Sequence, residues 1–235
     1  MAKPEKRFDP TFENGGYWEY YKDLERQFED FLEYVPYLEG NEKTYSFRLA
    51  NLLLVIGAHV DSAFKEIFKW SAFSKKYEKI LEKINAGKAN ITDYRKLEPE
   101  YNLSKRELIF KCLPDRETVI PFRGFDTESP KWWRDYNKIK HEFSLNFYKA
   151  NLKTTRDALA GAFLLNAIHE PASLRLFDYG LLEPKYEPES YFEIKYPIFK
   201  GHKMPPEYPV GKEIEDPFVI ETPLFIYDYE KGKKP

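Results

Sequence analysis

The sequence predicts an all-α fold, in which a helical bundle carries a small β-hairpin insertion and an irregular, proline-rich C-terminal extension. Three long segments repeat apolar residues at spacings of three and four, the pattern of amphipathic helices. Between two of these segments, short aliphatic and aromatic runs flank a polar turn, which indicates a hairpin. From residue 178 onward, closely spaced prolines exclude long helices.

The composition fits one domain with an appendage or, as a second alternative, two small domains. Of the 235 residues, 42% are hydrophobic and 17% are aromatic, so we expect a sizeable core. We divide the chain into a flexible lead-in at 1–16, a bundle at 17–177 and the extension at 178–235. The bundle contains an insertion at 91–128.

Charge and cysteine content narrow the function classes. With 37 basic and 39 acidic residues, the whole molecule lacks the positive charge typical of nucleic-acid-binding proteins. A local basic patch can still bind a nucleic acid. Cys112 is the only cysteine, which excludes an intrachain disulfide and favours a reducing compartment. The first residues lack the apolar region of a signal peptide, and the apolar run Leu52–Ala58 is shorter than the ~20 residues of a membrane helix. We therefore expect a cytoplasmic protein without membrane association.

Three helices are expected before the insertion. The first begins near Tyr17 and is ended by Pro36. The second, at 44–73, has the longest helical pattern and is expected to form the spine of the bundle. A shorter helix at 75–86 stops at Gly87.

Polar residues return in the second half of the long helix. We interpret His59 and Asp61 as a partly buried polar patch; a metal site in a bundle core would need paired Glu-x-x-His elements, which the sequence lacks. The phosphate-loop, dinucleotide, nucleophile-elbow and zinc-protease motifs are also absent from the sequence. We expect neither a metal nor a cofactor.

The insertion and the extension contain the expected strands. Runs at 108–110 and 118–120 form the predicted hairpin, and alternating aromatic residues predict short strands at 192–196 and 225–229. We expect the extension to wrap the bundle or a partner subunit, with pairing to the hairpin region at 106–123. An independent second domain is the less favoured alternative.

The segment 129–141 opens the second half of the bundle. Ser129 is placed as the helix cap and Pro130 at the first helical position. We expect a pause at 142–149 and a last helix that ends near Ile168. One apolar face of the segment consists of Trp132, Tyr136, Ile139, Phe143 and Phe147. The core is expected around Leu53, Ile56, Phe64, Ile139, Leu159 and Phe163, with Trp132 partly buried.

A second face of the same segment is basic. Arg134, Lys138 and His141 stand at i, i+4 and i+7, so Arg134 and His141 point the same way, about 10 Å apart along the axis. Such a stripe is usually only a solvated surface. A functional role is favoured by the two adjacent tryptophans and by Asp135 and Asn137. Exposing these side chains to water would be unfavourable if the segment had no other purpose.

The run W-R-D-Y-N-K-I-K-H resembles the R-x(4-6)-H motif of HEPN domains, helical bundles of which many are metal-independent ribonucleases. The resemblance covers roughly 17–169 and implies an HEPN-like helical bundle. It implies that Arg134 and His141 are catalytic and that Asp135 is the polar residue after the arginine. Asp135 stands where asparagine is commoner, and the motif has its longest spacing.

What the resemblance implies about function is cleavage of RNA by attack of the 2′-hydroxyl on its own phosphate. It implies a homodimer whose cleft holds two copies of the motif, toxin or phage-defence roles, and an antitoxin protein as a partner. In this interpretation Lys138 holds a phosphate and Asn137 orients a neighbouring group. The alternative is a non-catalytic helical module whose basic face binds a nucleotide, an RNA or a partner protein.

Overall fold

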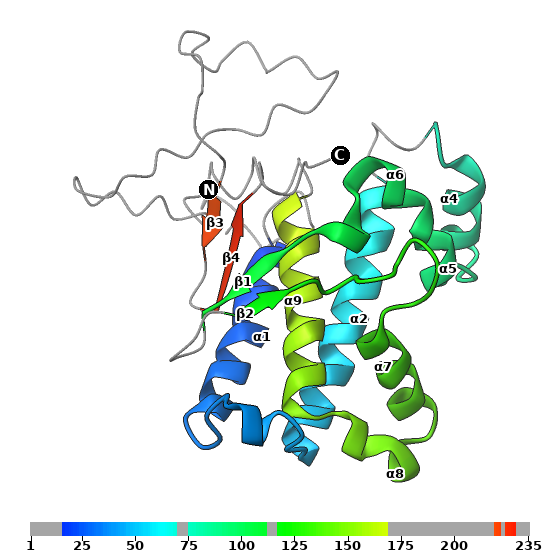
Figure 1. The fold of residues 1–235 in the computed structure, drawn as a ribbon. Coiled ribbons are helices and arrows are strands. Elements are labelled where there is room, and N and C mark those ends of the chain that lie inside the picture. The colour runs from blue at the N-terminus through cyan, green and yellow to red at the C-terminus, as the bar shows by residue number, and fades with distance from the viewer. Residues whose placement is uncertain (1–15, 70–74, 112–116, 169–218, 222–223, 229–235) are drawn as a thin grey trace, which may run out of the picture.

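A computed structural model describes residues 16–69, 75–111, 117–168, 219–221 and 224–228. The predicted strand at 192–196, the lead-in at 1–15 and Cys112 lie outside the described residues. Mostly helical secondary structure and a small antiparallel sheet make up the described part (Figure 1). The main helices are α1 (Gly16–Leu32), α2 (Phe47–Lys69), α7 (Lys131–His141) and α9 (Leu152–Ile168).

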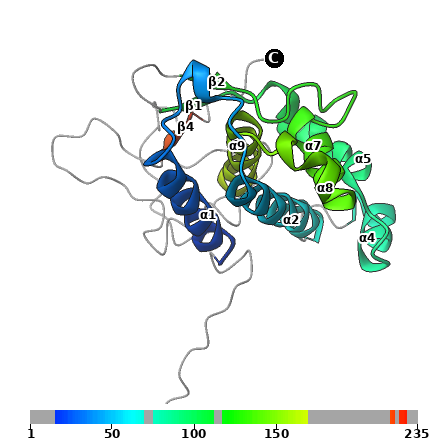
Figure 2. The same ribbon diagram turned by 90° about the horizontal axis from the view of Figure 1, so that it is seen from below.

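Helix α9 is the central element of the bundle. It contacts α1, α2 and α7, and from Ala158 to Ala167 every residue is buried. Figure 2 shows α1 and α7 on opposite sides of α9. The spine of the bundle is therefore the pair α2 and α9, rather than α2 alone. Among the described residues, only α2 is long and apolar enough to cross a membrane, and more than half of its most apolar stretch is buried, as in the core helix of a soluble protein.

Local signals fix the ends of the predicted helices. The hydroxyl of Ser46 accepts a hydrogen bond from the backbone N–H of Leu49 (3.1 Å), so α2 begins at Phe47, three residues after the predicted start. Helix α4 (Glu78–Asn85) ends as predicted, because Gly87 adopts a φ of +66°. The N–H of Lys88 then closes the turn on the carbonyl of Lys83 (2.8 Å).

The insertion contains short helices that the sequence pattern did not predict. They are α5 (Ile91–Tyr94), η3 (Arg95–Leu97), α6 (Glu98–Tyr101) and η4 (Leu103–Lys105), while η2 (Glu39–Asn41) precedes α2. Asn90 and Asp93 form a reciprocal capping box that starts α5. Asn102, in the left-handed conformation, ends α6.

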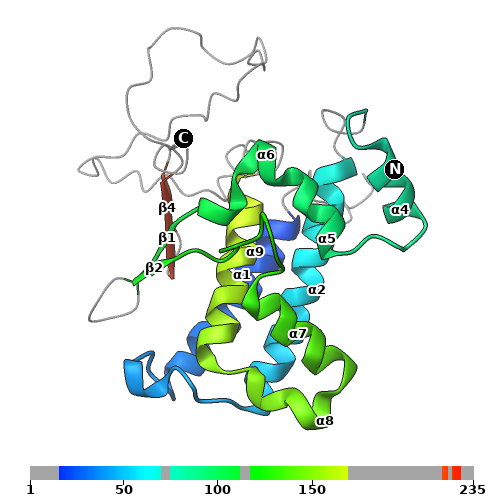
Figure 3. The same cartoon turned by 45° about the vertical axis from the view of Figure 1, so that its right-hand side comes forward.

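The sheet confirms the pairing expected between hairpin and extension. Strands β1 (Leu108–Phe110) and β2 (Glu117–Val119) form the hairpin, and β3 (Val219–Glu221) and β4 (Phe225–Asp228) come from the extension. The antiparallel order is β2-β1-β4-β3 (Figure 1), with Ile109 opposite Ile226. Figure 3 shows β1 between β2 and β4 from another side. Ahead of β4, the carboxylate of Glu25 in α1 accepts the backbone N–H of Leu224 (3.4 Å), which ties the extension to the bundle.

A buried arginine joins the sheet to α9. Arg156 is 2% exposed and forms ion pairs with Glu117 in β2 and with Asp157. Its guanidinium lies 5.1 Å from the centroid of the Tyr37 ring and 5.5 Å from that of Phe110. Charge pairing and ring contacts together offset the cost of burying this cation.

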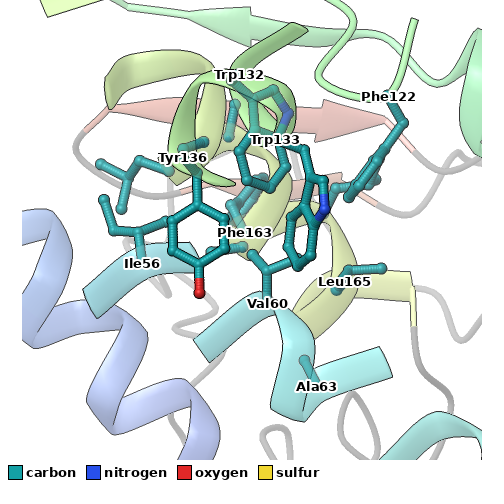
Figure 4. Packing of buried hydrophobic residues seen from close by; sticks show 14 of the residues in the cluster. Ile56, Val60, Ala63, Phe122, Trp132, Trp133, Tyr136, Phe163 and Leu165 are labelled. Atoms are coloured by element: carbon teal, nitrogen blue, oxygen red, sulfur yellow. The ribbon is translucent and has the colours of Figure 1, made fainter. Parts of the chain in front are cut away.

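The core matches the residues predicted for it. The six predicted residues, Leu53, Ile56, Phe64, Ile139, Leu159 and Phe163, are fully buried. Trp132 is 2% exposed, so the expectation of partial burial was wrong. The indole lies next to Gly161 of α9, and its N–H donates to the carbonyl of Pro121 (2.7 Å), which satisfies the polar atom of a buried ring. Figure 4 shows Trp132 packed among other buried side chains.

Candidate functional site on the basic face of helix α7

Helix α7 begins one residue later than the sequence suggested. Pro130, with φ −53° and ψ 147°, is the cap, and its carbonyl accepts the first helical bond from the N–H of Arg134 (3.1 Å). The assignment of Ser129 as the cap was wrong, because the extended ψ of Pro130 moves the helix start to Lys131. The carbonyl of Ser129 instead accepts a hydrogen bond from the guanidinium of Arg134 (2.7 Å).

The buried face of α7 fixes the orientation of the helix. Trp132, Trp133 and Tyr136 point into the core (Figure 4), and Ile139 is fully buried. The ring of Tyr136 lies directly over Gly57 of α2, where an added Cβ would come closer to the ring than the 3.0 Å that real contacts respect. This close approach leaves the opposite face of α7 toward solvent.

The structure places three of the five predicted site residues on that solvent face. Arg134, Lys138 and His141 are all exposed, as their i, i+4, i+7 spacing indicated. We call this set the basic face. Among the described residues none hydrogen-bonds to the side chain of Lys138 or His141.

The side chain of Arg134 has two partners near the start of α7. Its guanidinium pairs with Glu128 as well as with the carbonyl of Ser129. The side chains of Arg134 and Glu128 are 44% and 65% exposed, and an exposed pair of this kind contributes only about 0–1 kcal/mol. An incoming phosphate can therefore compete for the guanidinium without a large cost.

His141 is the last residue of α7. Its side chain is exposed, and no described residue covers it with a hydrogen bond. Glu142, with φ −148° and ψ 72°, breaks the helix at the predicted pause. Helix α8 (Phe143–Asn146) and the turn η5 (Phe147–Lys149) follow in a new direction (Figure 1).

The other two predicted site residues lie off the basic face. Asp135 is 7% exposed and accepts from the ammonium of Lys131 (2.5 Å). Asn137 donates to the carbonyl of Trp133 one turn earlier (3.1 Å). Among the described residues, no hydrogen bond or ion pair joins Asp135 to Arg134 or His141, so the structure does not bring the three motif residues together.

An exposed cluster of aromatic rings, which the sequence did not reveal, follows the basic face. Phe47 is 65% exposed, and its ring stacks on Phe147 with centroids 5.0 Å apart. Tyr45 meets Phe147 edge-on, and Phe143 stacks on Phe47. We call Tyr45, Phe47, Phe143, Phe147 and Tyr148 the aromatic surface.

The sequence placed Phe143 and Phe147 on the buried face of a continuous helix. Both rings are half-buried, because the break at Glu142 turns them toward the start of α2. The signal that could have located the surface was the interruption of the apolar pattern at Ser144 and Asn146. Lys149 lies over the Tyr148 ring, 4.6 Å from its centroid, so a cation borders the aromatic surface.

His59 and Asp61 do not form a metal centre with other described residues, among which no group of three ligands occurs. Asp61 is partly exposed and accepts a hydrogen bond from the Tyr94 hydroxyl (2.8 Å) and pairs with Lys65. His59, at 3% exposure, is more deeply buried than predicted. No family model, curated protein or solved structure matches the chain.

Proposed function

We propose that this protein is a metal-independent ribonuclease of the HEPN type, with the basic face of α7 as its catalytic site. The observation that carries the proposal is the exposure of Arg134 and His141 on one face of a helix whose other face is locked into the core. A rigid helix holds both groups at a fixed separation, which is what positioned catalysis needs.

The chemistry follows from the two side chains. The 2′-hydroxyl attacks the adjacent phosphorus, its proton passes to a base, and the 5′-oxygen leaves with a proton from an acid. An imidazole can serve as base or acid, and His141 supplies it. Arg134 offers a fork of N–H donors to the phosphate oxygens and to the charge that develops on them. The products are a 2′,3′-cyclic phosphate and a 5′-hydroxyl.

The surroundings of the motif suit a single-stranded substrate. Lys138 stands between the two catalytic residues and can hold a neighbouring phosphate. The aromatic surface offers rings on which unpaired bases stack, and each stacked base contributes about 1–3 kcal/mol. Cations beside exposed rings are the usual combination in proteins that bind single strands.

A two-fold dimer completes the proposed site. One chain supplies one histidine on this face, whereas the reaction benefits from both a base and an acid. A symmetric dimer brings a second Arg134 and His141 into one cleft. We extend the proposal to a cytoplasmic toxin or defence effector that an antitoxin protein holds in check.

The second candidate is a non-catalytic module that binds RNA, a nucleotide or a partner protein through the same face. The ion pair of Arg134 with Glu128 and the pairing of Asp135 with Lys131 favour it, because neither contact serves cleavage. In this alternative the basic face binds phosphates but no proton is transferred.

The deciding experiment incubates the full chain with total RNA in EDTA. We expect cleavage by the wild type, and a loss of about 100-fold or more in the His141→Ala and Arg134→Ala proteins. Arg123→Ala is the matched control, since Arg123 is an exposed arginine outside the site. Chelator-sensitive cleavage, or full activity without His141, contradicts the proposal. RNA binding that depends on Arg134, without cleavage by the wild type, favours the binding module.

A further inference from the structure

A pocket lies between the start of α1 and the middle of α2, apart from the basic face. Its volume is about 540 Å³, and its lining includes Tyr17, Tyr20, Ala58, His59 and Ser62. Pockets that bind small molecules have volumes of about 300–1,000 Å³ and are mostly apolar, with a few placed polar groups. The proposed ribonuclease chemistry uses none of these residues.

The buried imidazole of His59 has a defined tautomer. The amide nitrogen of Asn166 donates to the carbonyl of Ala162 (2.9 Å), which fixes the orientation of the amide. The same nitrogen lies 3.2 Å from Nε2 of His59. Because this nitrogen can only donate, Nε2 must accept, and the ring proton is therefore on Nδ1.

Among the described residues, none accepts a hydrogen bond from the Nδ1–H group of His59, although the residue is only 3% exposed. His59 also lines the pocket. Its Nδ1 is not one of the described side-chain atoms that are both fully buried and without a hydrogen-bond partner, so it can be reached from the pocket. The donor therefore faces the pocket, where an acceptor atom of a bound molecule can take its hydrogen bond.

Two aromatic rings flank this donor. The ring centroids of Tyr17 and Tyr20 lie 5.3 Å and 5.2 Å from that of His59, Tyr17 tilted and Tyr20 edge-on. Rings at these separations make a surface against which a flat, apolar molecule packs well.

Among its described lining residues, the pocket has no lysine or arginine that could hold an anion. Burial lowers the pKa of His59 to about 4, so the imidazole is neutral at pH 7. Burial raises the pKa of Tyr17, and so do the carboxylates of Glu66 and Asp61. Asp61 and Glu66 are each paired with a lysine, whereas Glu19 places a carboxylate in the lining itself, which disfavours an anionic ligand.

We propose that this pocket binds a neutral, planar heteroaromatic molecule whose acceptor atom takes the hydrogen bond from Nδ1 of His59. The rings of Tyr17 and Tyr20 favour a planar ligand, and the Nδ1–H donor favours a ligand with a hydrogen-bond acceptor. The site is independent of the basic face, and it stands whether or not the chain cleaves RNA.

The test uses the full chain at pH 7.5 and saturation-transfer NMR. The probes are caffeine and quinazolin-4-one, both neutral, planar and rich in acceptors. Benzoate is the planar anionic control, and cyclohexanone is the neutral acceptor that is not planar. We expect saturation transfer to the two probes and little to either control. Failure of both probes to bind, or equal binding of benzoate, overturns the proposal.

Two variants locate the binding. Ala58→Trp, at an exposed position of the lining, fills the pocket and should abolish the signal, while Asn51→Trp, exposed two turns earlier on α2, should leave it unchanged. His59→Leu removes the donor and should weaken binding about fivefold, the loss of one neutral hydrogen bond. If His59→Leu fails to fold, the two tryptophan variants still decide the question. Binding that survives Ala58→Trp contradicts the site.

Discussion

The two histidines in the described part of the chain lie in opposite settings. His141 ends α7 in solvent, beside exposed cations, whereas His59 is 3% exposed between α1 and α9. The imidazole of His141 is open to solvent, whereas burial lowers the pKa of His59 to about 4 and keeps it neutral at pH 7. The surroundings of each ring, and not the residue type, therefore decide what the ring can contact.

The same contrast holds between the two faces of α7, and removal of its buried indole should have the largest effect. Trp132→Ala leaves a cavity against Gly161 and the Pro121 carbonyl without its donor. We expect a loss of about 4 kcal/mol in the free energy of unfolding, measured by urea denaturation. Phe47→Ala is the control, since that ring is 65% exposed and should cost a fraction of this. Equal losses would show that α7 is not anchored as described.

Acid should separate the two histidines next. The unfolded chain protonates His59 below pH 6.5, while the folded chain resists until about pH 4, so the unfolded state gains protons first and stability falls. Tyr17 and Tyr20 of α1 and Asn166 of α9 face the ring, and none supplies a countercharge.

Between pH 7 and pH 5 this linkage amounts to about 2 kcal/mol. Urea denaturation at the two pH values measures it. The His59→Gln protein should lose most of this pH dependence, whereas His141→Ala should keep it. The reverse pattern would mean that the assigned environments are wrong.

A smaller effect is expected where α7 rests on α2. Gly57→Ala places a methyl group against the Tyr136 ring, which must shift. Overpacking costs about 1–3 kcal/mol, and the better helix propensity of alanine returns about 1 kcal/mol. We expect a net loss of about 1 kcal/mol by urea denaturation. Ala58→Gly, at the neighbouring exposed position of α2, should cost only the difference in helix propensity between alanine and glycine. A stabilised Gly57→Ala protein would contradict the packing of α7 on α2.

The smallest stability change should come from the basic face itself. His141→Ala removes an exposed side chain and should alter the free energy of unfolding by less than about 0.5 kcal/mol. Thermal and urea unfolding measure this directly. A loss above 1 kcal/mol, on the scale of the Gly57 variant, would make His141 a structural residue.

The sequence predicted what helical and strand periodicity determine. The 3.6-residue repeat located α2, α9 and the exposure of Arg134 and His141, and alternation located the hairpin and its partner strand at 225–228. Periodicity could not locate the helices at 91–105, because each is only one turn long and depends on local capping by residues such as Asn90.

Contacts between distant segments were also beyond the sequence. The stacking of Phe47 on Phe147 depends on the break in the helix at Glu142. No local sequence pattern shows in which direction the chain continues after that break. The tautomer of His59 depends on Asn166, which is 107 residues away in the chain. Likewise, Asp135 follows Arg134 in the sequence and was predicted to act with it, but in the folded chain its carboxylate accepts a hydrogen bond from Lys131.

The central claim is that the exposed face of α7 carries the chemistry, and the ends of the RNA products test it most directly. The full chain is incubated in EDTA with a single-stranded RNA oligonucleotide and with its 2′-deoxy counterpart, and the ends are identified by mass spectrometry. We predict 2′,3′-cyclic phosphate and 5′-hydroxyl ends from the RNA, none from the deoxy substrate, and none from the well-folded His141→Ala protein. Products with 3′-hydroxyl and 5′-phosphate ends, or cyclic phosphates formed equally well without His141, would contradict the claim.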